Sequence, residues 1–117
     1  MTGGIELLHR HVERFNAGVR DRDFSSMVAG FSEEAELRFE GIPVGPFTGR
    51  AAIAEAYRTR PPDDQIRLLE AAERPDGTVV ARYAWLSEPG VDAGGLELTG
   101  RDGRITRMVV RYGGRAR

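Results

Sequence analysis

The spacing of apolar residues changes along this chain, and that change is what most restricts the fold. In segment 4–19 the apolar side chains recur in steps of three and four residues, at Ile5, Leu8, Val12, Phe15 and Val19. This spacing places them on one face of an α-helix. Beyond residue 65, short runs rich in β-branched and aromatic residues are separated by turn residues, which is typical of strands joined by hairpins. We therefore expect an α+β protein with its helices in the N-terminal half.

The same reasoning gives the order of the elements: helix, helix, strand, helix and then four strands. We place helices at 4–19, 23–31 and 50–59, and strands at 35–41, 65–73, 78–87, 96–99 and 105–112. The run Asn16-Ala17-Gly18 resembles the end of a helix, and segment 41–50, rich in glycine and proline, is expected to be irregular. Pro75-Asp76-Gly77 predicts a hairpin turn, and the tail 113–117 is expected to fray.

Length and composition narrow the class of protein. The 117 residues fit one domain spanning 1–117, and the formal net charge of −1 argues against a nucleic-acid partner. Without cysteine, disulfides and thiolate nucleophiles are excluded. The sequence has no bilayer-spanning apolar run and no signal peptide, so we expect a cytoplasmic protein without a membrane partner. It also has no phosphate-binding loop or metal-ligand spacing, so we expect no cofactor and no metal.

Four stretches together resemble the nuclear transport factor 2-like superfamily, which includes SnoaL-like polyketide cyclases and ketosteroid isomerases. They are HRHVERFNAG, DFSSMVAGFSEEAELRF, GPFTGRAAIAEAY and GRDGRITRMVVRYG, in that order along the chain. The resemblance implies a cone-shaped, curved, mostly antiparallel sheet wrapped around three N-terminal-half helices, a cystatin-like α+β roll. It also implies an apolar pocket on the concave face and homodimers through the opposite face. The activity stays open, because this fold hosts several chemistries and domains with none.

The positions that carry catalysis in ketosteroid isomerases are changed in this chain. Aligned by the resemblance, the oxyanion-binding tyrosine falls on His11 and the base aspartate falls on Phe39. The second aspartate falls near Gly95. Because isomerisation needs a base near the operating pH and donors aimed at the developing charge, steroid isomerase activity is not expected.

His11 and Tyr57 are the predicted catalytic residues. The resemblance places Tyr57 where the isomerases carry a tyrosine bonded to the oxyanion-binding tyrosine, so a pair with His11 across the cavity is predicted. Histidine changes its charge near neutral pH, which suits proton transfer. The alternative is that His11 is a core residue beside Leu8, Val12 and Phe15, and that Tyr57 is a cavity wall.

Five further residues are predicted to bind the ligand: Phe39, Arg82, Met108, Val110 and Tyr112. The last three share one face of the final strand. For segment 78–87 the resemblance favours the face carrying Arg82 as the inner one, although a slip of one residue would reverse the assignment. Tyr83 and Trp85 are then core or dimer-face residues, and Asp92 is a turn residue.

Three hypotheses for function follow. The first is a cofactor-independent enzyme of isomerase, cyclase or hydrolase type acting on a small apolar, oxygenated molecule. The second is a module that binds such a molecule without chemistry. The third is a dimerisation domain whose cavity is filled by its own side chains.

Overall fold

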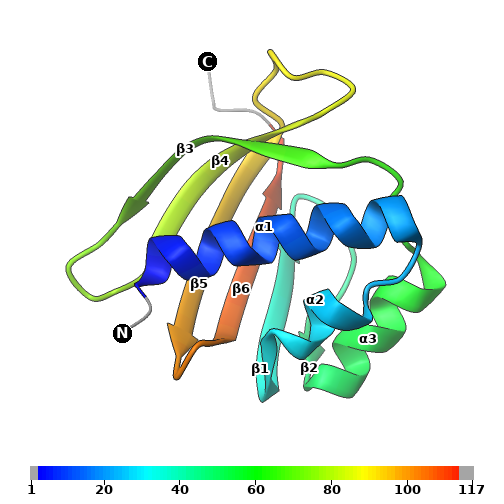
Figure 1. The fold of residues 1–117 in the computed structure, drawn as a ribbon, viewed down its shortest axis with the longest axis vertical. Coiled ribbons are helices and arrows are strands. Elements are labelled where there is room, and N and C mark those ends of the chain that lie inside the picture. The colour runs from blue at the N-terminus through cyan, green and yellow to red at the C-terminus, as the bar shows by residue number, and fades with distance from the viewer. Residues whose placement is uncertain (1–2, 114–117) are drawn as a thin grey trace.

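The computed structural model describes residues 3–113, and a curved, unclosed sheet is its framework (Figure 1). Three helices accompany the sheet in the described part: α1 (Gly4–Asp21), α2 (Ser25–Ala29) and α3 (Arg50–Thr59). The strands are β1 (Phe31–Glu40), β2 (Phe47–Thr48), β3 (Ile66–Glu73), β4 (Val79–Trp85), β5 (Gly94–Arg101) and β6 (Arg104–Tyr112).

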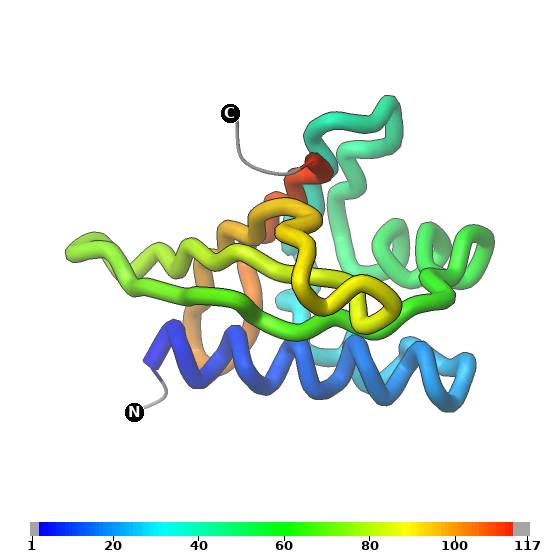
Figure 2. Tube along the Cα trace, turned by 90° about the horizontal axis from the view of Figure 1, so that it is seen from above, coloured from blue at the N-terminus to red at the C-terminus, as the bar shows by residue number. Residues whose placement is uncertain are grey.

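The sheet order β2-β1-β6-β5-β4-β3 brings the first long strand beside the last. β1 and β6 run parallel, and each of the other neighbouring pairs among the described strands is antiparallel. α1 lies across one face of the sheet, and α3 packs beside β1 and β2 on the same side (Figures 1 and 2). The predicted α+β class, with a curved and mostly antiparallel sheet, is thus confirmed.

The core forms where the apolar stripe of α1 meets the inner face of the sheet. Leu8 is fully buried from the helix side, and Leu98 and Met108 are buried from β5 and β6. Burying one such side chain contributes about 1.5–3 kcal/mol relative to leaving it in water. The stripe predicted from spacing therefore fixes which side of α1 faces the sheet.

The first helix does not end at Asn16-Ala17-Gly18, so that prediction is wrong. The Asn16 side chain instead joins α1 to the start of β3: its Nδ2 donates to the Ile66 carbonyl, and its Oδ1 accepts from the Ile66 amide, both at 2.9 Å. Gly18 lies against Phe24, whose Cδ1 would be 2.5 Å from a Cβ at that position. The motif serves packing, and the helix ends at Asp21, followed by Arg22 in a left-handed conformation.

The second helix and first strand also differ from expectation. α2 is shorter than 23–31, and β1 begins at Phe31 because that residue pairs with Ile105 of the distant strand β6. Two residues of the segment predicted to be irregular form β2 on the free edge of β1. Helix α3 matches 50–59, and the turn at 75–77 joins β3 to β4 as predicted. The tail predicted to fray is 113–117, and its residues 114–117 lie outside the described residues.

Candidate functional site

A cavity of about 650 Å³ lies between the helices and the inner face of the sheet. This volume is in the range of sites for small molecules. Most of its lining is apolar, and its aromatic members come from six different elements. They are Phe15 on α1, Phe39 on β1, Phe47 on β2, Tyr57 on α3, Tyr83 and Trp85 on β4, and Tyr112 on β6.

The structure brings most of the sequence-predicted residues to this cavity. Phe39 lies on β1 and Tyr112 on β6, and their rings stack with centroids 6.1 Å apart. Met108 and Val110 line the cavity from the same face of β6 as Tyr112. The parallel pairing of β1 with β6 places Phe39 directly opposite Val110. The period-two pattern of two strands thus puts four predicted side chains on one surface.

His11 lies in the cavity wall and is only 5% exposed. Its ring packs edge-on against Phe31 at 5.6 Å. Burial, together with the nearby positive charge of Arg14, lowers the pKa of His11 from 6.5 to about 4. The imidazole is therefore neutral at pH 7, and the expectation that it changes charge near neutral pH does not hold. A neutral imidazole still offers one hydrogen-bond donor and one acceptor.

Tyr57 lines the same cavity from α3 and is 7% exposed. Burial and the neighbouring phenols of Tyr112 and Tyr83 raise the pKa of its hydroxyl, which stays protonated and able to donate. Within residues 3–113 no hydrogen bond joins His11 to Tyr57, and none joins His11 to a carboxylate. The two predicted residues share a cavity but do not form a catalytic pair in this state.

Arg82 does not face the cavity, which corrects the predicted register of β4. It lies on the outer face of the sheet, where Nη2 donates to Asp92 Oδ1 at 2.7 Å and Nε donates to Oδ2 at 3.0 Å. A guanidinium inside the apolar cavity would need a buried ionic partner. The inner face of β4 instead carries Tyr83 and Trp85, and Arg82 finds its partner on the outer face. Asp92 also accepts from the Gly94 amide at 3.1 Å, so it is both a turn residue and an ion-pair partner.

Tyr83 and Trp85 are cavity residues that the sequence analysis assigned to the core or the dimer face. Their rings meet edge-on at 5.6 Å on the inner face of β4. Tyr83 is 2% exposed, and its hydroxyl has no hydrogen-bond partner among the residues the structure describes. In register, Gly94 of β5 stands between Tyr83 and Tyr112. The signal that could have found them is the more apolar composition of their face of the strand.

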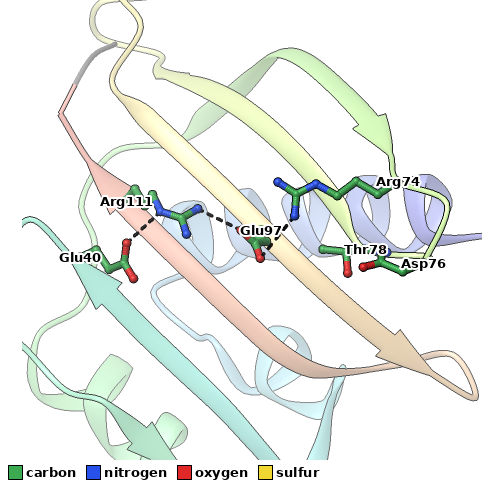
Figure 3. Close-up of polar contacts among 6 residues, drawn as sticks. All are labelled: Glu40, Arg74, Asp76, Thr78, Glu97 and Arg111. Carbon is green, nitrogen blue, oxygen red and sulfur yellow. Dashed lines mark hydrogen bonds and ion pairs between the residues drawn. The ribbon is translucent and has the colours of Figure 1, made fainter. Parts of the chain in front are cut away.

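The outer face of the sheet carries charged side chains joined across strands (Figure 3). Arg111 on β6 donates to Glu40 at 2.8 Å and to Glu97 at 3.2 Å, and Glu97 is 3.9 Å from Arg74. These groups face away from the cavity, with α1 behind the sheet (Figure 3). The sheet therefore separates an ionic outer surface from an aromatic inner one. No group of three or more histidine, aspartate or glutamate side chains in the described chain could hold a metal ion.

Comparison with known proteins decides the family. The model of the SnoaL-like domain matches residues 12–110. The chain belongs to the SnoaL-like family. No curated protein sequence matches it. Among the described helices, none has the length and apolar character needed to cross a bilayer.

Solved structures share the fold of this SnoaL-like chain. A candidate isomerase of Bacillus subtilis is 20% identical, with a TM-score of 0.69, and the match covers 95% of this chain and 89% of that one. A nuclear transport factor 2-like protein of Burkholderia xenovorans is 14% identical, with a TM-score of 0.71 and coverage of 97% and 85%. A candidate polyketide cyclase of Xanthomonas campestris is 22% identical, with a TM-score of 0.62 and coverage of 95% and 93%. At these identities the likeness establishes the fold.

Proposed function

We propose that this SnoaL-like protein binds a small, mostly apolar molecule that carries a carbonyl or hydroxyl oxygen. The observation that supports this is the kind of polar group in the cavity. The buried polar side chains of its wall, His11, Tyr57 and Tyr83, are all uncharged at neutral pH and can hydrogen-bond. The charged lining residues Glu55 and Arg60 are exposed.

This arrangement selects an uncharged ligand. A buried charge without a partner costs far more than a buried hydroxyl, and the inner cavity offers no opposite charge among the described residues. A carbonyl oxygen can accept from a tyrosine hydroxyl or from the imidazole N–H, while the rest of the ligand packs on aromatic rings. Burying an unpaired donor such as the Tyr83 hydroxyl destabilises the empty cavity. A ligand oxygen that accepts its hydrogen bond removes this cost, and this favours binding.

A second candidate function is cofactor-independent catalysis of isomerase or cyclase type. It is favoured by two structural neighbours, a candidate isomerase and a candidate polyketide cyclase. In that case His11 accepts a proton and Tyr57 donates to the ligand oxygen. Because a base with a pKa of about 4 removes protons weakly at neutral pH, binding is the first proposal. Proton exchange at the carbons beside the carbonyl of 2-nonanone in D₂O, faster with the wild type than with His11→Ala, would favour catalysis.

Substituting His11 tests the binding proposal, with 2-nonanone as the probe. Trp85 is the single tryptophan and lines the cavity, so its fluorescence reports occupancy. His11→Phe keeps an aromatic ring against Phe31 but removes both nitrogens, and we expect the Kd to rise about five- to tenfold because one hydrogen bond is lost. His9→Ala, on the exposed side of the same helix, is the matched control and should leave the Kd unchanged. Equal affinities for all three proteins would remove His11 from the site, and no binding to the wild type would reject the proposal.

We further propose that two copies associate through the outer face of the sheet. In register across five strands, the residues on this face read Glu70, Arg82, Gly95, Arg111 and Glu40. An arginine and a glutamate are adjacent at each end of this row, so a two-fold axis parallel to the strands and running between β6 and β1 would set Arg111 of each copy against Glu40 of the other. Such an interface is self-complementary, as a symmetric dimer requires.

Reversing the charge of Arg111 tests this dimer. We expect Arg111→Glu to weaken the dimer at least about tenfold in sedimentation equilibrium, because acidic groups would then face one another. Raising salt from 0.1 to 1 M should weaken the wild-type dimer in the same direction. Arg58→Glu, an exposed charge reversal on α3, is the control. A wild type that stays monomeric, or an Arg111→Glu protein that dimerises as well as the wild type, would contradict the proposal.

A further inference from the structure

A second pocket of about 600 Å³ opens on the helix side of the molecule. It lies between the end of α1, α2, α3 and the segment 61–63. Its inner surface is apolar, with Phe24 and Val28 buried and Val19 and Ala54 partly buried. Its charged members Arg22, Asp23, Arg58 and Asp63 are exposed. This pocket is therefore suited to an apolar chain, as the cavity on the sheet side is.

Two residues line both spaces, Tyr57 and Pro62. The Tyr57 ring lies between the sheet-side cavity and the helix-side pocket, and it contacts Phe24 at 5.2 Å. Phe24 lines only the helix-side pocket, whereas Phe15, 6.0 Å from Phe24, lines only the cavity. The wall between the two spaces is thus one layer of aromatic rings.

The three rings of this wall are all buried but differ in the spaces that they line. Phe24 rests on Gly18, where any side chain would collide with its ring. Phe15 belongs to the buried stripe of α1 and packs in the core. Tyr57 projects from α3 and belongs to the same core cluster, but among the described residues its hydroxyl makes no hydrogen bond. Because its side chain lines both spaces, shortening Tyr57 is the change that joins them directly.

We infer that Tyr57 sets the length of the apolar chain this protein accepts. The inference rests on the proposed binding function and adds a ligand class, a chain of limited length that ends in a carbonyl group. Each methylene buried in the cavity strengthens binding about fourfold, whereas a methylene left in water adds nothing. Affinity along a homologous series must therefore rise with chain length until Tyr57 is reached and then level off.

The test is a titration of the straight-chain 2-ketones from 2-hexanone to 2-undecanone, followed by Trp85 fluorescence. We expect the wild-type affinity to level off within this series. We call the chain length at which affinity levels off the break. Tyr57→Ala should move the break to longer ketones, so that the affinity of this variant still rises about fourfold per added methylene beyond the wild-type break. Tyr57→Phe keeps the ring and loses only the hydroxyl, so it should leave in place the chain length at which affinity levels off.

The outcomes separate this inference from the proposed function. If the wild type binds none of the ketones, the binding proposal fails and the inference fails with it. If the wild type binds and all variants break at the same length, the inference alone is overturned. Tyr57→Leu, with an intermediate side chain, guards against a folding defect in Tyr57→Ala. Tyr57→Leu should move the break in the same direction by fewer carbons. An unmoved break in the folded Tyr57→Leu protein would also overturn the inference.

Discussion

Gly94→Ala is expected to lower the free energy of unfolding by about 3 kcal/mol or more, the largest effect among the single substitutions considered. A Cβ on Gly94 would lie 1.9 Å from the carbonyl oxygen of Arg111 on the neighbouring strand. A flexible side chain could move away from such a contact, but this atom belongs to the backbone of the β5–β6 pair. Relief therefore requires the two strands to separate where Gly94 pairs with Tyr112.

The matched control is Gly90→Ala, because a Cβ there meets nothing within 4 Å and the residue's φ is not in the left-handed region. Its unfolding free energy should stay close to that of the wild type. Urea denaturation measures both variants, and thermal denaturation should show Gly94→Ala melting roughly 10 °C or more below the wild type. Equal stabilities for the two alanine variants would mean that β5 and β6 are not paired as described.

Gly94 also affects the cavity, because it stands between two of its tyrosines. A Cβ at this position would lie 3.1 Å from the Tyr83 hydroxyl. The absence of a side chain therefore lets Tyr83 on β4 and Tyr112 on β6 flank β5 on the inner face without a bulky residue between them. The same glycine serves strand pairing and the shape of the proposed site.

The sequence was sufficient to predict the elements whose structure is decided by local signals. Helix α3 matches its predicted bounds because a proline pair follows it and sets its end. The turn at 75–77 joins two strands because Asp-Gly chemistry suits a tight hairpin. The inward face of β6 was also predictable, since Met108, Val110 and Tyr112 recur every second residue.

The sequence was insufficient to predict the features that depend on contacts between distant segments. The parallel pairing of β1 with β6 extends β1 to Phe31, and no local pattern in 31–34 reveals a partner more than 70 residues away. Both faces of β4 alternate in a way that fits an inner face, so the sequence alone could not decide which face points inward. The choice that was made placed Arg82 in the cavity, and it was wrong. The low pKa of His11 was equally hidden, because it results from the depth at which the folded chain buries the ring.

Burial of neutral His11 predicts a loss of stability in mild acid. In the unfolded chain its pKa is near 6.5, and in the folded protein it is about 4. Between these values the unfolded chain binds a proton that the folded protein does not, so acid favours unfolding. The stability contributed by the neutral state is fully present above pH 6.5 and is lost as the pH falls towards 4. At about 1.4 kcal/mol per pH unit, the whole difference is about 3 kcal/mol.

Comparison with His11→Phe isolates this contribution. Other groups, such as Asp92 with its pKa lowered by the Arg82 hydrogen bonds, also lose stability in acid, but they do so equally in both proteins. Urea denaturation from pH 7 to 4 should therefore show the wild type losing up to about 3 kcal/mol more unfolding free energy than His11→Phe as the pH falls. His9→Ala should follow the wild-type curve, since that side chain is exposed. Parallel curves for wild type and His11→Phe would mean that the imidazole charges freely in the folded state, and His11 would then regain the titration near neutral pH that acid–base catalysis needs.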